Sequence, residues 1–282
     1  MNGFVVVDKP AGMTSHDVIA RLRRALGERR IGHAGTLDPA ATGILLIGVG
    51  RGTRLLRFLE AHEKEYEADA ILGLRTSTQD AEGDVTGEAD ASAVTEQDVR
   101  ALLPRFTGEI DQVPPMVSAV KIGGERLYKK ARRGEEVERA PRRVTVHALD
   151  LMGFESGPHA RASLRVVCSR GTYIRTLAAD LGDALGVGAH LTALRRTRVG
   201  PYALDKAVPL DAVTSEQLAP MAEALSGYPR HDVGVDGARA LIQGKPLPAA
   251  GLDGPYAVFG PDGLVAMAED RGEELRSLCV VA

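Results

Sequence analysis

The sequence predicts a mixed α+β fold, in which a large body of strands and helices precedes a small β-rich C-terminal unit. Two observations predict it. Short apolar or alternating runs typical of strands are interspersed with amphipathic helical segments up to about residue 228. From about His231 the pattern changes to one short helix and three strand-like runs. With 282 residues, 44% of them hydrophobic, we expect domains at 1–228 and 229–282.

The N-terminal elements follow from local patterns. Thr14 or Ser15 can cap a helix because a side-chain oxygen there accepts a free backbone N–H. That helix carries its arginines opposite an apolar face made of Val18, Ile19, Leu22, Ala25 and Leu26. We expect a strand at 4–7, a glycine-rich loop at 32–43, a strand at 44–49 and a short basic helix around 53–59.

In the rest of the large N-terminal part, the alternation of apolar and charged residues and the residues that interrupt regular structure predict the helices and strands. From Lys64 to Leu72 apolar and charged residues alternate, which predicts a half-exposed strand with Tyr66 on its apolar side. The acidic stretch 77–110 reads as a surface excursion that includes a helix opened by Thr95. We further expect a basic helix at 125–133, paired strands at 142–154 and 161–168, and an amphipathic helix at 172–185.

Composition and charge restrict the function. Cys168 and Cys279 match no metal or disulfide spacing, and there is neither a leader pattern nor an apolar run of membrane length, so we expect a cytoplasmic protein without a metal. The net charge of −3 hides segregation. Acidic residues dominate 60–111, whereas basic residues gather at 21–30, 51–57, 121–143 and 195–198. Such patches suit a nucleic acid, although solvated helix faces would look the same.

The stretch 32–43 is the strongest candidate for chemistry. It holds one carboxylate, Asp38, among glycines, small residues and Pro39. This composition suits a rigid loop that passes close to a ligand and aims one acid at it. An Asp-Pro pair is also a common turn opener, so the local pattern alone leaves both interpretations open.

Arg175 is the natural partner for that acid. It follows the corner at Gly171 and Thr172, which places Tyr173 and Arg175 in the first turn of an apolar helix. A guanidinium there is costly unless it meets an anion, and pairing with Asp38 would keep the carboxylate ionised. Arg175 could instead be a surface residue that faces Asp180 or Asp183.

These stretches together resemble the TruB family of pseudouridine synthases, the tRNA pseudouridine(55) synthases. The resemblance spans about residues 3–202, and the stretch around Asp38 is its most specific part. Val117 departs from the pattern, since the family usually has an aromatic residue there. The matching residues are Asp8, Lys9, Pro10, Gly12, Thr14 and Ser15; residues 32–43; Lys64, Tyr66, Leu72, Gly73, Thr76, Thr78, Asp80 and Gly83; Gln112, Val113, Pro114, Pro115, Ser118, Ala119 and Lys121; Arg126, Leu127, Tyr128, Ala131 and Arg132; and residues 168–181 and 191–200.

The resemblance implies a largely antiparallel sheet, a PUA-like RNA-binding domain at the C-terminus, and isomerisation of the T-loop uridine 55 of tRNA to pseudouridine. It implies no cofactor, no obligatory protein partner and a monomer that binds the T stem-loop. Asp38 would be catalytic, Arg175 its partner, Tyr66 the stacking platform for a flipped base, and Leu194, Tyr173 and Lys9 further parts of the pocket. His33 would fill the vacated place in the RNA. Further RNA contacts are expected from Lys121, Arg126, Lys129, Lys130, Arg132 and Arg195.

Three chemical routes stay open at this point: Asp38 could add to the uracil ring, attack C1′, or remove a ribose proton to give a glycal. Two other functions were weighed. A guide-RNA-dependent relative is disfavoured by the acidic excursion and by the lack of a lysine-rich tail. A non-catalytic RNA chaperone would explain the charge segregation but not the joint pattern of Asp38, Tyr66 and Arg175. A phosphate-binding loop at 32–43 is excluded because no Gly-Lys-Ser/Thr end is present.

Overall fold

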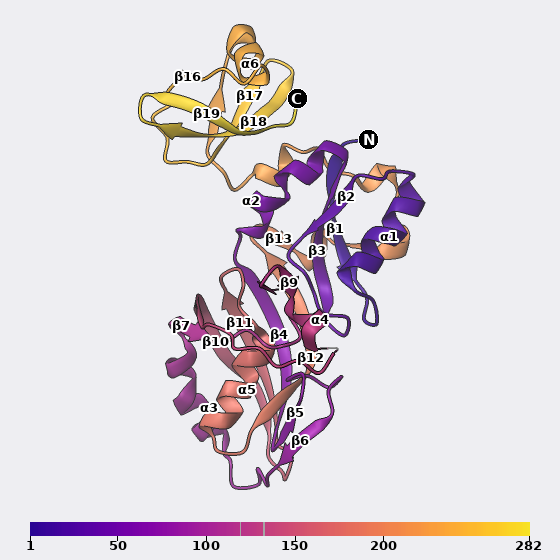
Figure 1. Cartoon of the computed structure of the whole chain (residues 1–282), viewed down its shortest axis with the longest axis vertical. Coiled ribbons are helices and arrows are strands. Elements are labelled where there is room, and N and C mark those ends of the chain that lie inside the picture. The colour runs from indigo at the N-terminus through magenta and orange to yellow at the C-terminus, as the bar shows by residue number, and fades with distance from the viewer. Residues whose placement is uncertain (119, 132) are drawn as a thin grey trace. The chain divides into compact units, whose positions relative to one another are not determined.

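The computed structural model describes residues 1–118, 120–131 and 133–282, with the backbone alone at 121, 122, 126 and 128 (Figure 1). The chain divides into two compact units. The first consists of Met1–Pro39, Gly43–Ala61 and Gly200–Ala282. The second consists of Ala40–Thr42 and His62–Val199. The first unit is therefore assembled from both ends of the chain.

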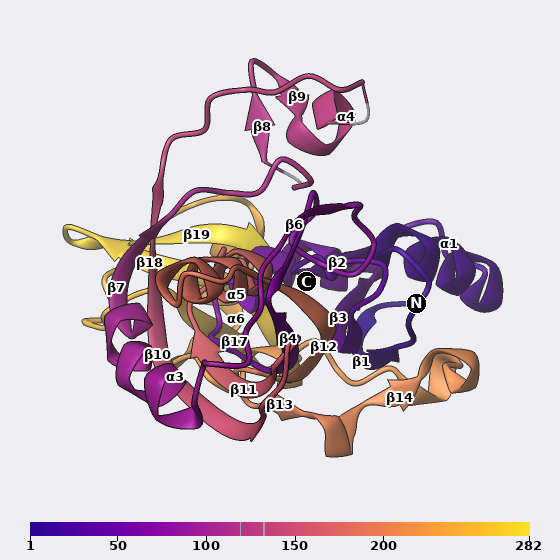
Figure 2. The same cartoon turned by 90° about the horizontal axis from the view of Figure 1, so that it is seen from below.

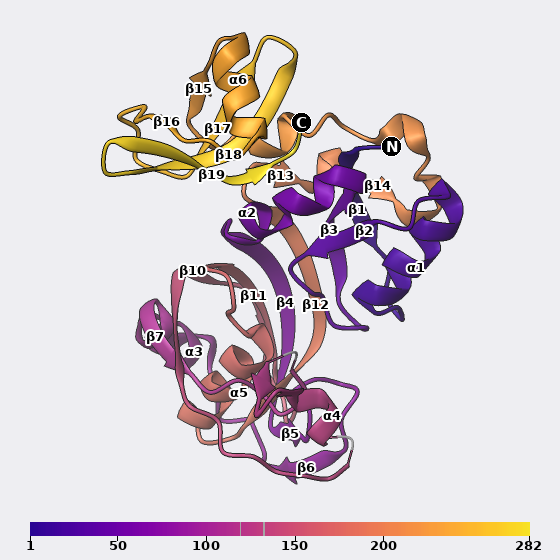
Figure 3. The ribbon, with the colours of Figure 1, turned by 45° about the horizontal axis from the view of Figure 1, so that its top comes forward.

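In the first unit, a small sheet is packed against one helix. Strand β1 (Gly3–Lys9) pairs antiparallel with β3 (Thr42–Val49) and parallel with the short β14 (Val208–Pro209). Helix α1 (Ser15–Leu26) lies beside these strands, as Figure 3 shows, and buries Val18, Ile19 and Leu22 in their core. The remaining short elements are η1 (Gly50–Leu55), α2 (Leu56–Glu60), β13 (Tyr202–Ala203), η3 (Leu204–Lys206), η4 (Leu210–Ala212), η5 (Ser215–Gln217) and η6 (Glu223–Leu225).

The start of α1 was predicted correctly. Thr14 is the N-cap and forms a capping box with Asp17. The side chain of each residue accepts from the backbone N–H of the other, and these two groups have no acceptor within the helix. One residue of the predicted apolar face is wrong: Ala25 is exposed. It lies at the margin of the apolar face, whereas the next residue, Leu26, still packs against the core.

The stretch 32–43, expected to be a loop throughout, begins in a strand. Strand β2 (Ile31–Ala34) pairs antiparallel with β3, with His33 opposite Ile47. Only about residues 35–41 form the loop. The glycine content conceals β2 in the sequence because tertiary pairing, not local propensity, makes this segment extended.

In the second unit, five antiparallel strands form a sheet in the order β12 (Ala189–Val199), β4 (Lys64–Leu72), β11 (Arg161–Cys168), β10 (Arg142–Glu155) and β7 (Gly108–Gln112). The alternation predicted for β4 is confirmed, since Tyr66, Ala68, Ala70 and Leu72 are all buried. Helices α3 (Glu96–Leu102) and α5 (Ile174–Ala184) and the turn η2 (Leu103–Phe106) also belong to this unit.

Two stretches of the second unit carry hairpins that the sequence did not indicate. The acidic stretch contains β6 (Val85–Glu88), which pairs with β5 (Leu74–Thr76). The basic stretch contains β8 (Lys121–Ile122) and β9 (Glu125–Arg126), followed by α4 (Leu127–Ala131). Figure 2 shows β8, β9 and α4 together, joined to β7 and β10 by long connections. The helix expected at 125–133 is shortened because Glu125 and Arg126 belong to the hairpin.

The C-terminal residues of the first unit contain the predicted helix and the three predicted strands, and two further short strands, β15 (Arg230–Asp232) and β16 (Leu247–Pro248), extend the sheet to five strands. The helix is α6 (Val235–Ile242), and its buried residues Ala238 and Leu241 share a core with Tyr256 and Val258. The strand order in this sheet is β15, β17 (Tyr256–Gly260), β18 (Gly263–Arg271), β19 (Glu274–Val280) and β16.

No helix within the described residues has both the length and the apolar character needed to cross a bilayer.

Candidate active site

The backbone on the N-terminal side of Asp38 is fixed by a serine. The Ser15 hydroxyl, at the start of α1, donates to the Leu37 carbonyl over 3.1 Å and accepts from the Leu37 N–H over 2.9 Å. Ser15 is 1% exposed and Leu37 3% exposed, so this reciprocal pair is shielded from water. Both backbone groups of the residue before Asp38 are therefore satisfied by one side chain.

The backbone on the other side is fixed by β1 and its following turn. The Pro39 carbonyl accepts from the Gly12 N–H over 2.9 Å and from the Lys9 ammonium over 3.1 Å. Lys9 is fully buried and also donates to the Pro10 carbonyl over 2.8 Å. Glycines with φ of +79° and +98°, Gly35 and Gly43, bracket the loop in a conformation that side chains disfavour. The half-buried Asp38 thus projects from a rigid loop.

His33 lies on β2, two residues before this anchored loop begins. It is half-buried, and its ring meets that of His16 edge to face, with ring centres 5.6 Å apart and planes at 79°. His16 belongs to the first turn of α1, next to Ser15. The same helix end therefore contacts both His33 and the residue before Asp38.

In the second unit, the structure brings Tyr66 and Leu194 to one face of the sheet. Tyr66 on β4 is 7% exposed. Leu194 on β12 is half-buried and stands opposite Ala68, two residues along from Tyr66. Residues two apart on a strand, and residues directly opposite across a pair, project to the same side. This combination supplies an aromatic ring and an aliphatic side chain on one surface.

Arg175 is buried, so its interpretation as a surface residue facing Asp180 or Asp183 is wrong. It lies in the first turn of α5 and is 4% exposed. Its guanidinium donates to Asp80 Oδ2 over 3.0 Å and to the carbonyls of Thr78 and Val117, each over 2.9 Å. Asp183 pairs instead with Arg75 on β5, over 2.6 Å. The pairing of Arg175 with Asp38 stays a prediction.

Asp80 is the functional candidate whose role the sequence reasoning missed. Besides Arg175, its carboxylate accepts from the Thr78 hydroxyl and from the Glu82 N–H, the latter over 3.1 Å. The neighbouring Gln79, with φ of +64°, accepts from the Thr176 hydroxyl of α5 over 3.0 Å. The turn at 78–82 is therefore fastened to α5 at two points. Thr78 and Asp80 stood in the motif, but nothing in their spacing pointed to Arg175.

Tyr173 is the N-cap of α5 and not part of its first turn. Its backbone is extended, with φ −99° and ψ 106°. The Gln112 side chain, 1% exposed, holds both of its backbone groups: the amide donates to the Tyr173 carbonyl over 3.2 Å, and its oxygen accepts from the Tyr173 N–H over 3.0 Å. Because an N-cap residue is extended, local pattern could not separate it from the helix that follows.

The remaining candidates are placed less fully. Lys129 is exposed and Lys130 half-buried, both on α4. Arg195, half-buried on β12, donates to the Thr42 hydroxyl over 3.2 Å. The side chains of Lys121 and Arg126, and Arg132 as a whole, lie outside the described residues.

Cys168, the first residue of the matching stretch 168–181, is not a nucleophile at neutral pH. It is 1% exposed, and burial raises the pKa of its thiol to about 11. A thiol with such a pKa is almost entirely protonated at pH 7. Among the described residues, no three His, Cys, Asp or Glu side chains are grouped as metal ligands would be.

Family models match the chain from residue 23 to its end. They are "TruB family pseudouridylate synthase (N terminal domain)" at 23–174, "tRNA pseudouridylate synthase B C-terminal domain" at 175–228, and "tRNA Pseudouridine synthase II, C terminal" at 228–282. Relatives named tRNA pseudouridine synthase B include that of Thermobifida fusca (strain YX), 50% identical over 100% of this chain and 99% of its own. That of Rhodococcus jostii (strain RHA1) is 46% identical over 99% of this chain and 93% of its own.

Solved structures are similar over the same length. A Cbf5-Nop10-Gar1 complex matches with a TM-score of 0.76 and 28% identity, and an H/ACA RNP bound to a substrate RNA containing 2′-deoxyuridine with 0.74 and 26%. Each match covers 99% of this chain and 85% of the other. The chain belongs to the TruB family of pseudouridylate synthases and is an enzyme of that class, an isomerase.

Proposed function

We propose that this tRNA pseudouridine synthase converts uridine 55 of the T loop to pseudouridine, with Asp38 as its catalytic residue and without a cofactor. The observation that carries the proposal is the match to relatives named tRNA pseudouridine synthase B, one of which is 50% identical over 100% of this chain. The structures whose titles name H/ACA or Cbf5 assemblies are 26–28% identical. This contrast favours a stand-alone tRNA enzyme over a guide-RNA-dependent one.

The reaction balances without an external reagent. The bond between C1′ and N1 breaks, a bond between C1′ and C5 forms, the C5 proton is lost and N1 regains a proton. No electrons are exchanged with another molecule, so a redox cofactor has no task. A carboxylate next to the anomeric carbon is what such chemistry needs, as in glycoside hydrolysis.

Asp38 would act in one of three ways: by adding to the ring, by attacking C1′, or by taking a ribose proton. The anchors on both sides of the loop support all three, because each requires the carboxylate to be held within a fraction of an ångström. Tyr66 would stack on the flipped base and Leu194 would pack against it, a combination supported by their common face. Arg175 would keep the Asp38 carboxylate ionised, as the family resemblance implies.

Access to the uridine requires base flipping, since C1′ and C5 are shielded in a stacked loop. His33 would occupy the vacated position. Unstacking costs a few kcal/mol, which contacts to the RNA backbone would offset. We expect those contacts from Lys121, Arg126, Lys129, Lys130, Arg132 and Arg195, and we expect a cytoplasmic monomer that needs no protein partner.

The test replaces Asp38 by asparagine, which keeps the shape of the side chain and removes its charge. Asp38→Asn should abolish pseudouridine formation in an unmodified T stem-loop transcript, while RNA binding stays within about twofold, because the anchors involve neighbouring backbone groups. Pseudouridine mapping after incubation with the pure protein, without added metal, measures the first effect. Asp236→Asn, at a side chain 98% exposed on α6, is the control. Turnover by Asp38→Asn, or modification of another position, would contradict the proposal.

A further inference from the structure

Three arginines, three residues apart on η1 and α2, donate to the end of strand β19. Arg57 donates to the Leu278 carbonyl over 2.6 Å, Arg54 to that of Val280, and Arg51 to that of Val281 over 3.4 Å. Figure 3 shows the end of β19 beside this segment. We call Arg51, Arg54 and Arg57 the arginine row. The Arg57 guanidinium also lies 4.7 Å from the centre of the Phe58 ring, which further restricts it.

The row is fixed in place without being neutralised. Its acceptors are main-chain carbonyls, which carry no net charge, and all three arginines are exposed. In the described part of the chain, none of them forms an ion pair with a carboxylate. Each guanidinium has five N–H groups, so donation to one carbonyl leaves others for a second acceptor. The cost of ordering a long side chain, up to about 2 kcal/mol, is already met before any ligand binds.

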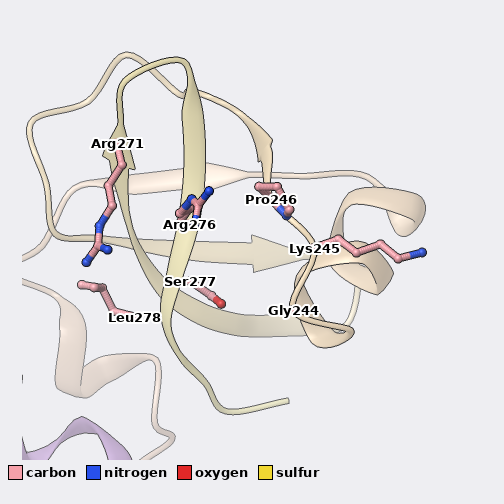
Figure 4. A pocket seen from close by; sticks show the side chains of 7 residues that line it. All are labelled: Gly244, Lys245, Pro246, Arg271, Arg276, Ser277 and Leu278. Atoms are coloured by element: carbon pink, nitrogen blue, oxygen red, sulfur yellow. The ribbon is translucent and has the colours of Figure 1, made fainter.

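The C-terminal residues that supply these carbonyls carry more acidic than basic side chains. Residues 228–282 contain five basic and eight acidic side chains. Their cavity of about 280 Å³ is lined by Lys245, Arg271 and Arg276, but Arg271 pairs with Glu269 over 2.6 Å and Arg276 with Glu274 over 2.7 Å. Figure 4 shows the Lys245 ammonium pointing away from both arginines. The arginine row is therefore better suited to phosphate than this cavity.

We propose that the arginine row is a binding surface for the phosphate backbone of RNA, and that β19 is the element that positions it. This rests on the proposed function, which supplies RNA as the ligand. Three residues of helix rise about 4.5 to 6 Å, which lets adjacent guanidiniums contact successive phosphates of one strand. The C-terminal residues then support RNA binding by orienting arginines of η1 and α2.

The experiment measures the dissociation constant of the full-length protein for an unmodified tRNA transcript, by fluorescence anisotropy at several salt concentrations. An Asp38→Asn background separates binding from turnover. Arg54→Gln and Arg57→Gln should each raise the dissociation constant roughly tenfold and reduce the salt slope by about 0.7 to 0.9, the loss of one phosphate contact. Thermal unfolding of each variant confirms that it is folded.

Lysine variants test the positioning role of β19. Lysine keeps the charge but is a flexible point charge that lacks the planar fork needed to serve a carbonyl and a phosphate together. Arg54→Lys and Arg57→Lys should therefore keep the salt slope yet raise the dissociation constant at least about threefold. Arg239→Gln and Arg239→Lys are matched controls, because that side chain is 65% exposed on α6 and faces Asp236.

Each contrary outcome has its own meaning. Glutamine variants that bind tRNA like the parent protein would refute the phosphate contact. If the lysine variants bind tRNA like the parent protein while the glutamine variants bind it more weakly, positioning by β19 is refuted, and the charge of these side chains is sufficient for binding. Wild-type protein that neither binds nor modifies tRNA would overturn the proposed function itself, a result independent of the arginine variants.

Discussion

Removal of the Asp80 carboxylate should destabilise the protein far more than removal of an equally close carboxylate on the surface. Asp80 and Arg175 have side chains 13% and 5% exposed, at 3.0 Å. Breaking a buried pair from one side costs about 3–5 kcal/mol, because the remaining charge stays desolvated. Arg175 keeps the Thr78 and Val117 carbonyls and, in the proposed function, the Asp38 carboxylate, so we expect the lower end, about 3 kcal/mol, for Asp80→Ala.

Asp183→Ala is the matched control for this prediction. The Arg75–Asp183 pair is shorter, at 2.6 Å, but its side chains are 43% and 57% exposed. Solvent screens such a pair, so its loss should cost about 0–1 kcal/mol. Urea unfolding of both variants, with circular dichroism as the probe, measures the difference. Equal losses for the two variants, or a loss below about 1 kcal/mol for Asp80→Ala, would refute the reasoning that burial decides.

Two further predictions concern buried groups near the site. Ser15→Ala leaves the buried Leu37 N–H without its acceptor, so we expect about 1–3 kcal/mol of destabilisation and a turnover at least about tenfold lower at saturating RNA. The control is Ser92→Ala, at an exposed serine. Unchanged turnover in Ser15→Ala would contradict the anchoring role. For Cys168, whose pKa is raised to about 11, a thiol reagent at pH 8 should label one cysteine in the folded protein and two after unfolding. Between pH 9 and 11 the Cys168 thiol loses its proton in the unfolded chain but keeps it in the folded chain, so the free energy of unfolding should fall with rising pH. If the free energy of unfolding of Cys168→Ala falls equally with pH, this thiol is not the cause.

Elements with a regular period were predictable from the sequence. The alternation from Lys64 to Leu72 placed Tyr66 correctly on the buried side of β4, and the capping pattern at Thr14 placed the start of α1. Both are local signals: each depends on side-chain spacing along one element. They also placed two parts of the candidate site: the buried Tyr66 on β4, and the helix end that contacts the loop of Asp38.

Strand β12, which carries Leu194 and Arg195, was not predicted, and its geometry explains why. Its pairing with β4 shifts register between Leu191 and Ala193, and again between Arg196 and Arg198. Each shift adds a residue that breaks the period-two pattern by which strands are identified. The fully buried Arg196, 1% exposed, disguises the strand further, because a charged residue reads as solvent-facing.

The partner of a buried ion pair could not be predicted from the sequence, for a related reason. The expectation that Arg175 needs an anion was sound, and the structure supplies Asp80, 95 residues away along the chain. The choice among several carboxylates depends on which turn the fold brings to the start of α5. Local pattern does not contain that information, and the pairing with Asp38 that the family resemblance implies stays a prediction.

The discontinuity of the first unit has a consequence for folding during synthesis. Its core joins Val5, Val7 and Ile19 to Leu210 and Val213, and Phe4 exchanges backbone hydrogen bonds with Ala219. At about 5–20 residues per second, some 10–40 s pass between synthesis of the two sides. The contacts of Ser15 with Leu37 and of Lys9 with Pro39 lie within the first 39 residues and can form early. Ribosome-bound chains should thus possess the loop before the core beneath it is complete, and the nearly contiguous second unit can fold during the interval.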